Sequence, residues 1–328
     1  GAGLETIATK FGWSSRQIRR ILHKELGVSP MELVLTRRLL LAKQLLTETS
    51  LPMSEVSSAS GFSSLRRFND AFSSRYGMPP SRFRRATEST RSAHASADIF
   101  TLQLAYRAPF DWEGILAFLS ARAMKGIEAI VDGTYLRTVR LGETSGWLRV
   151  RNNPERRVLL VDVTHSLTPA LPALLGRLRN VFDLSARPDV IAQHLSLDSM
   201  LEPIVARNPG LRVPGSFDGF ELAVRAILGQ QITVKGATTL AGRFADEFGD
   251  PIDTPNPELS RLMPSPDRIA AAKPGDIASL GVVQSRAHGV ITVAREISSG
   301  RLDLEAGADP EKTIRQLIAL PGIRSEER

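Results

Sequence analysis

Cysteine is absent from all 328 residues of this sequence. A chain without thiols can form no disulfide, no thiolate metal site and no cysteine nucleophile of its own. Its five histidines are scattered without the spacing of metal ligands, so we predict no metal site and no cofactor. Apolar runs fall far short of a membrane span, and the N-terminus lacks a signal-peptide pattern. We therefore expect a cytoplasmic location and no membrane partner.

Charge is not spread evenly along the chain. The formal net charge is +7, and residues 1–90 hold 14 Lys and Arg against 7 Asp and Glu, whereas the remainder holds 28 of each. At about 150 residues per domain, the length predicts two or three domains. The excess of positive charge in the first quarter favours a nucleic-acid-binding module there. A basic face exposed only to solvent is the alternative.

The first ninety residues contain an internal repeat. The motif GWSSR at residues 12–16 recurs as GFSSL at 61–65, and GVSP at 27–30 recurs as GMPP at 77–80. Each copy predicts a helix, a turn and a second helix that carries arginines. We predict that these arginines contact DNA grooves and phosphates, with a helical bundle as the alternative; they are Arg16, Arg19, Arg20, Arg66, Arg67 and Arg75.

A single long helix is predicted between the two copies, over residues 30–49. At 1.5 Å per residue it spans about 30 Å, close to the one-turn spacing of about 34 Å between half-sites, so one chain could read two successive major grooves. The arrangement resembles the double helix-turn-helix of AraC-type regulators, and RRLLLAKQLLTETSLPMSEVSSASGFSSLRRFNDAF resembles the Ada-type alkylation-response regulators. The resemblance implies an operator in double-stranded DNA, transcription activation and RNA polymerase as a partner. Ada-type proteins begin with a cysteine-rich methyl-acceptor domain, so we expect this chain to be a piece that lacks it.

Beyond residue 86 the periodicity changes. Residues 87–98, TESTRSAHASAD, are small and polar and predict a linker. Apolar residues then alternate from Phe100 to Tyr106, which predicts a strand with one buried face. Four further strands and two helices predict an α+β domain with an antiparallel sheet over residues 99–183.

Residues 184–328 are predicted to be helical, and their central stretch is residues 216–248. An apolar stripe from Phe220 to Leu228 predicts a helix that ends before Gln230 and Gln231, because an amide buried without partners costs about 1–3 kcal/mol. Thr233 is placed to cap the next helix. The two glutamines are thus predicted to lie on a tight connector.

The segments FDGFELAVRAILGQQITV, LGVVQSRA, LPGI and APFDWEGILAFLSAR resemble the AlkA-type 3-methyladenine DNA glycosylases of the helix-hairpin-helix superfamily. The resemblance implies that Gln231, beside Gln230, is the wedge that fills the gap left by an extruded nucleotide; the alternative is a helix end in solvent. It implies a base-pocket wall at Phe118, with Arg122 near the lesion, although a helical phenylalanine is usually core. It also implies a hairpin that binds a DNA phosphate, with a monovalent cation on its carbonyls, at Leu320, Pro321, Gly322 and Ile323.

The catalytic aspartate of that superfamily lies downstream of the hairpin. We therefore expect it beyond Arg328, and expect the 328-residue chain to be inactive as a glycosylase of alkylated purines. Asp218 and Glu221 are interpreted as a helix-capping box. The fold class predicted is multidomain: an all-α double helix-turn-helix at 1–86, the linker, the α+β domain, and an incomplete all-α helix-hairpin-helix domain at 184–328. A regulator with a degenerate glycosylase half, and a glycosylase that uses helix-turn-helix domains only for nonspecific grip, stay open.

Overall fold

The computed structural model describes residues 4–10, 12–49, 51–87, 98–305 and 307–321. The chain divides into two compact units, residues 1–94 and 95–328. Each unit has its own hydrophobic core, which is the property that defines a domain.

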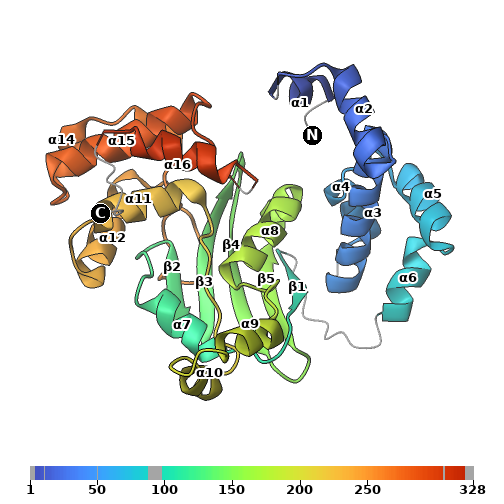
Figure 1. Ribbon diagram of the computed structural model, residues 1–328, viewed down its shortest axis with the longest axis horizontal. Coiled ribbons are helices and arrows are strands. Elements are labelled where there is room, and N and C mark those ends of the chain that lie inside the picture. The colour runs from blue at the N-terminus through green and yellow to red at the C-terminus, as the bar shows by residue number, and fades with distance from the viewer. Residues whose placement is uncertain (1–3, 11, 50, 88–97, 306, 322–328) are drawn as a thin grey trace. The chain divides into compact units, whose positions relative to one another are not determined.

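The first unit is helical throughout its described residues (Figure 1). Serine caps set where its helices begin. Ser14 accepts a hydrogen bond from the Gln17 backbone N–H (3.2 Å), and the Gln17 side chain accepts one from the Ser14 N–H (2.7 Å). Ser29 and Glu32 form the same reciprocal box, and each such cap contributes about 1 kcal/mol. The helices are α1 (Leu4–Lys10), α2 (Ser15–Leu26), α3 (Pro30–Glu48), α4 (Met53–Ala59), α5 (Leu65–Tyr76) and α6 (Pro80–Thr87).

Two helix pairs, α1 with α2 and α4 with α5, flank the long helix α3, as the repeat predicts. Their core includes Leu45 and Leu46 of α3 and Phe68 and Phe72 of α5, all fully buried. Helix α6 was not predicted. Its sequence is dominated by arginine, and the residue that fixes it is Phe83, whose ring lies 5.5 Å from that of Phe72. That contact is tertiary and has no local sequence pattern.

The second unit opens with a five-stranded antiparallel sheet in the order β1-β5-β4-β3-β2. In β1, Phe100, Leu102 and Leu104 are buried whereas Thr101 and Gln103 are half-exposed, so the alternation predicted the buried face correctly. The antiparallel sheet domain predicted from the sequence is confirmed. The strands are β1 (Ile99–Ala105), β2 (Glu128–Val131), β3 (Thr134–Leu141), β4 (Thr144–Asn153) and β5 (Val158–Thr164).

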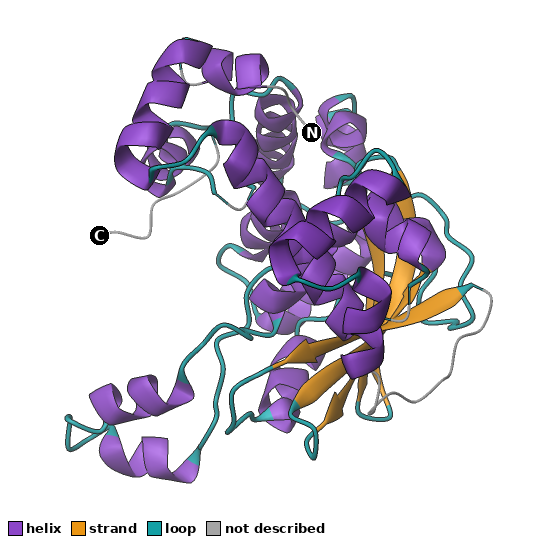
Figure 2. Ribbon diagram, turned by 90° about the vertical axis from the view of Figure 1, so that its right-hand side faces the viewer, coloured by secondary structure: helices purple, strands orange, loops and turns teal. Residues whose placement is uncertain are grey.

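Helices α7 (Trp112–Ser120) and α8 (Leu171–Val181) pack on this sheet, and a short 3₁₀ helix, η1 (His165–Ala170), precedes α8. Asp111 caps α7 by accepting a hydrogen bond from the Gly114 N–H at 2.8 Å. Phe182, just after α8, meets Tyr135 of β3 edge to face, with ring centroids 5.5 Å apart. Figure 2 shows the twist of the sheet beside the helical layers.

The remainder of the second unit is helical. Its core lies between α11, α12 and α15 and includes Phe220, Val224, Phe244 and Val290. The five-residue helix α14 was not predicted. The elements are α9 (Pro188–Leu195), α10 (Glu202–Arg207), α11 (Gly219–Gly229), α12 (Val234–Phe248), α13 (Pro266–Ala270), α14 (Pro274–Ala278), α15 (Gln284–Ser298) and α16 (Pro310–Ile318). Of the helices that the structure describes, none combines the length and the apolar character needed to cross a membrane.

Candidate functional site

The connector between α11 and α12 has an unusual backbone. Helix α11 ends at Gly229, as predicted, and Gln230 leaves the helical conformation with φ −56° and ψ 127°. Gln231 has φ 55°, in the left-handed region, which costs a residue other than glycine about 1–2 kcal/mol. Thr233 then caps α12 by accepting a hydrogen bond from the Gly236 N–H at 3.1 Å. As a result Gln230 is half-buried and Gln231 is exposed at the tip.

A cavity of about 430 Å³ opens beside this connector. Gly229 and Ile232, which flank the glutamine pair, line it, and so do Phe118 and Arg122 from the end of α7 and the turn after it. The structure therefore brings the predicted wedge to the edge of the cavity that holds the predicted pocket residues. These segments are more than 100 positions apart in the sequence.

Phe118 is 40% exposed, which is unusual for a phenylalanine in a helix. The guanidinium carbon of Arg122 lies 3.8 Å from the centre of the Phe118 ring, in cation–π contact. Arg122 also donates a hydrogen bond to the Phe118 carbonyl at 3.3 Å. The ring thus presents a face to which a planar cation binds.

The cavity floor is a buried network of charged side chains that no sequence pattern predicts. Arg137 of β3 pairs with Glu128 of β2 at 2.8 Å and with Glu221 of α11, and Arg225 of α11 pairs with both carboxylates. Tyr135 donates a hydrogen bond to Glu128 at 2.6 Å. Two guanidiniums thus balance two carboxylates, and this network joins the helix that carries the glutamines to the sheet.

Arg225 has one further contact, because it also donates a hydrogen bond to the carbonyl of Arg122 at 2.6 Å. That bond ties α11 to the turn after α7. The spacing between the glutamine connector and Phe118 is therefore set by side-chain contacts at the cavity floor as well as by the fold.

Protonation follows from these contacts. Burial alone would raise the pKa of Glu221, but the charges of Arg137 and Arg225 lower it to about 2. Burial alone would lower the pKa of Arg137, but the carboxylates of Glu221 and Glu128 raise it well above its ordinary value. Glu221 and Arg137 are therefore both charged at neutral pH.

One interpretation of this region was wrong in part. Asp218 caps α11 as expected, by accepting a hydrogen bond from the Glu221 N–H at 2.9 Å. The Glu221 side chain does not complete a capping box, because both of its oxygens bind arginines. Glu221 binds Arg137, 84 residues away, rather than the backbone at the start of its own helix. A buried carboxylate without a cation would cost more free energy than a second capping hydrogen bond would contribute.

In the first unit, all six predicted DNA-contacting arginines are exposed. Arg16, Arg19 and Arg20 are spaced three and four residues apart on α2, so they share one face. Arg66 and Arg75 do not, because nine residues at 3.6 per turn place them on opposite sides of α5. The first helix therefore offers the more concentrated basic face.

The predicted hairpin is described only at its start. Leu320 packs against the helical core and Pro321 is exposed, whereas Gly322 and Ile323 lie outside the described residues. Among the described residues there is no group of three or more His, Asp or Glu side chains that could hold a metal ion.

Three family models match successive parts of the chain. They are a helix-turn-helix domain over residues 7–86, the AlkA N-terminal domain over 101–218, and the HhH-GPD superfamily base excision DNA repair protein over 224–321. DNA-3-methyladenine glycosylase 2 of Escherichia coli is 34% identical over 67% of this chain and 75% of its own length. The chain belongs to the AlkA family of DNA-3-methyladenine glycosylases.

This AlkA-family chain carries a helix-turn-helix region ahead of the part that matches glycosylases. One relative is similar to it over both parts. A probable bifunctional transcriptional activator/DNA repair enzyme AlkA of Mycobacterium tuberculosis is 35% identical over 98% of the chain, which spans 64% of that protein's length. A 3-methyladenine DNA glycosylase structure from Archaeoglobus fulgidus aligns with a TM-score of 0.58 at 19% identity, covering 68% of this chain and 75% of its own, and supports the fold alone. The resemblances to AraC-type regulators and to AlkA-type glycosylases are confirmed, and so is the multidomain fold class predicted from the sequence.

Proposed function

We propose that this AlkA-family protein acts in the response to DNA alkylation. In this proposal the first unit binds an operator in duplex DNA and regulates transcription. The second unit recognises an alkylated purine in duplex DNA by extruding its nucleotide into the cavity, as base excision requires.

The observation that carries the proposal is the position of the glutamine pair. Gln231 projects from a left-handed connector whose neighbours, Gly229 and Ile232, line the cavity. A nucleotide leaving its stack costs a few kcal/mol, and a side chain that enters the gap beside the receiving pocket offsets part of that cost. An amide can also bond the base that is left without a partner.

The chemistry of the cavity fits an alkylated purine. The Phe118 ring attracts the Arg122 guanidinium in cation–π contact, and an aromatic ring would likewise attract an alkylated base, which is electron-poor and often cationic. The two carboxylates that line the cavity, Glu128 and Glu221, are both held in ion pairs. We therefore assign recognition to this cavity and do not assign the reacting carboxylate to either residue.

The first unit supports the regulatory half of the proposal. Helix α3 has 19 residues and so spans about 28 Å between the two helix-turn-helix pairs, near the spacing of two major grooves. The exposed Arg16, Arg19 and Arg20 supply donors for phosphates and guanine edges. RNA polymerase is the further partner that an activator of this kind would need.

Several finer assignments belong to the same proposal. We propose that the segment beginning at Leu320 forms the phosphate-binding hairpin, with a monovalent cation on its carbonyls. We propose functional parts at residues 1–86, 99–183 and 184–328, joined by a linker at 87–98. A cytoplasmic location goes with them, because there the protein would meet its DNA.

The test is the binding of a duplex that contains an abasic site. Gln231→Ala should weaken binding to this duplex about tenfold, which is 1.4 kcal/mol, because the side chain no longer fills the gap or bonds the orphaned base. Fluorescence anisotropy at matched salt measures this, against an undamaged duplex of the same sequence.

Gln193→Ala is the matched control, because Gln193 is an exposed glutamine on α9, away from the connector. It should leave both affinities unchanged. If Gln231→Ala and Gln193→Ala bind the abasic duplex as tightly as the parent chain does, Gln231 is not the wedge and the extrusion half of the proposal is lost. Equal binding of all duplex sequences at matched salt would remove the operator half.

A further inference from the structure

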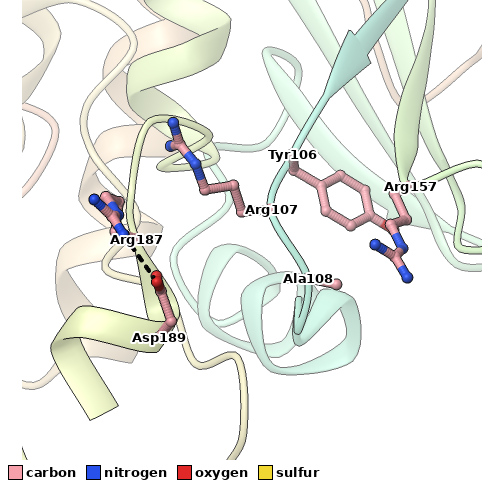
Figure 3. A pocket seen from close by; sticks show the side chains of 6 residues that line it. All are labelled: Tyr106, Arg107, Ala108, Arg157, Arg187 and Asp189. Carbon is pink, nitrogen blue, oxygen red and sulfur yellow. Dashed lines mark hydrogen bonds and ion pairs between the residues drawn. The ribbon is translucent and has the colours of Figure 1, made fainter. Parts of the chain in front are cut away.

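A second cavity, of about 500 Å³, lies at the end of β1 and shares no lining residue with the cavity beside the glutamine pair. In Figure 3, Arg107 and Arg187 lie on one side of the backbone of residues 106–108, and Tyr106 and Arg157 lie on the other. Three of the six lining residues are arginines, and the only carboxylate among them is Asp189.

The charges in this cavity are not balanced. Arg187 pairs with Asp189 at 3.0 Å. Arg107 donates hydrogen bonds to the carbonyls of Ser185 and Ala186 at 3.0 and 3.3 Å, which orient its guanidinium without neutralising it. Neither Arg107 nor Arg157 has an ion pair within the described part of the chain. Two cations therefore remain without a counter-charge.

A buried arginine directly behind the cavity adds a further positive charge. Arg212 is 4% exposed and donates hydrogen bonds only to carbonyls, those of Arg107, Pro109 and Asp183, at 2.5, 3.0 and 3.4 Å. Its Nε has no hydrogen-bond partner among the described residues. Burial lowers the pKa of Arg212, and the nearby Asp183 charge offsets only part of that effect. An anion nearby would offset more of it.

The backbone around the cavity is held firmly. Arg157 has φ 53°, and its carbonyl accepts a hydrogen bond from the Tyr106 N–H at 3.1 Å. Gly210, with φ 80°, lies so close to Pro109 that a side chain there would clash with its backbone. A left-handed residue other than glycine persists only where its surroundings fix it, so Arg157 is presented from a constrained loop.

We propose that this cavity binds a phosphate group. Guanidinium forks match phosphate oxygens in shape and charge, and the Arg107 fork is already oriented by its hydrogen bonds to two carbonyls. The phosphate could be a free anion or one in a DNA backbone, and both present the same oxygens. Neither source requires the wedge or the Phe118 cavity, so the site stands apart from the function proposed above.

The experiment uses the full chain and two probes, inorganic phosphate and a short undamaged duplex. Arg107→Gln with Arg157→Gln removes the two unpaired cations from exposed positions. Arg207→Gln with Arg295→Gln is the control, since these exposed arginines also bond carbonyls and lie outside the cavity. Calorimetry follows phosphate binding at constant ionic strength, and anisotropy follows duplex binding as a function of salt.

We expect the cavity double variant to bind phosphate at least tenfold more weakly than the parent, with the control within twofold. Lysine at both positions keeps the charges but not the forks and should restore part of the affinity, which separates loss of a ligand from loss of folding. If DNA is the source, the slope of log affinity against log salt should also fall by about 0.9 per lost phosphate contact. A fall in phosphate affinity with unchanged DNA slopes supports the site with a free anion as its ligand. If the two glutamine doubles cannot be distinguished with either probe, the proposal is overturned.

Discussion

The arginines of α2 and those of the buried network in the second unit have opposite roles. On α2, Arg16, Arg19 and Arg20 are exposed and form no ion pair with any residue described by the structure. In the second unit, Arg137 is 3% exposed and bonds two carboxylates. The exposed arginines leave their donors free for a polyanion, whereas the buried one holds a sheet to a helix. The comparison shows that net charge locates a DNA-binding surface only when the pairing of each cation is known, since a paired arginine adds little to the external field.

The largest effect should come from breaking the buried network. Arg137→Ala leaves two buried carboxylates, Glu128 and Glu221, with Arg225 as the one cation of the network, so the free energy of unfolding should fall by about 3–5 kcal/mol. Chemical denaturation measures it. The control is Arg151→Ala, which removes one of two half-exposed arginines from Asp162 and should cost less than about 1 kcal/mol. If both variants lose the same free energy of unfolding, the contribution of an ion pair in this protein does not depend on its burial.

Acid should weaken the same network over a defined pH range. The folded pKa of Glu221, about 2, lies below its ordinary value of 4.5, so its contribution to stability is complete above pH 4.5 and is lost as the pH falls towards 2. A shift of this size corresponds to about 3 kcal/mol. The parent chain should therefore lose its advantage over Glu221→Gln across that range. A difference between the two unfolding free energies that stays constant from pH 6 to pH 3 would contradict the shift.

The smallest effect on stability, and the most specific effect on DNA binding, should come from changing an exposed arginine of α2. Arg20→Ala should leave the unfolding free energy within about 0.5 kcal/mol of the parent's, because the side chain is exposed on a helix. It should weaken duplex binding and reduce the salt slope by about 0.9 if Arg20 contacts one phosphate. Titrations at several salt concentrations test this. A destabilised variant with an unchanged slope would give Arg20 a structural role.

Local patterns in the sequence predicted much of the fold. The connector is the clearest case, because the helix end at Gly229 and the cap at Thr233 follow from an apolar stripe that would otherwise bury an amide. The alternation in β1 fixed its buried face for the same reason: a short-range period reports a local environment.

Long-range pairing could not be predicted in this way. The four charged members of the network at the cavity floor lie at residues 128, 137, 221 and 225, and no motif connects them. Glu221 was interpreted as a capping residue because the only partner visible in the sequence was three positions away. The cluster around Arg212 was missed for a related reason, since its partners are carbonyl oxygens, which every residue has.

The left-handed backbone at Gln231 limits which amino acids can occupy the tip of the connector. Valine, isoleucine and threonine branch at Cβ and are genuine outliers at positive φ, so they would distort the loop before they could fill a gap in a base stack. Leucine, methionine and asparagine do not branch there. Attempts to enlarge or reshape the tip by directed evolution should therefore yield unbranched side chains, and a library restricted to β-branched residues at this position should yield none that work.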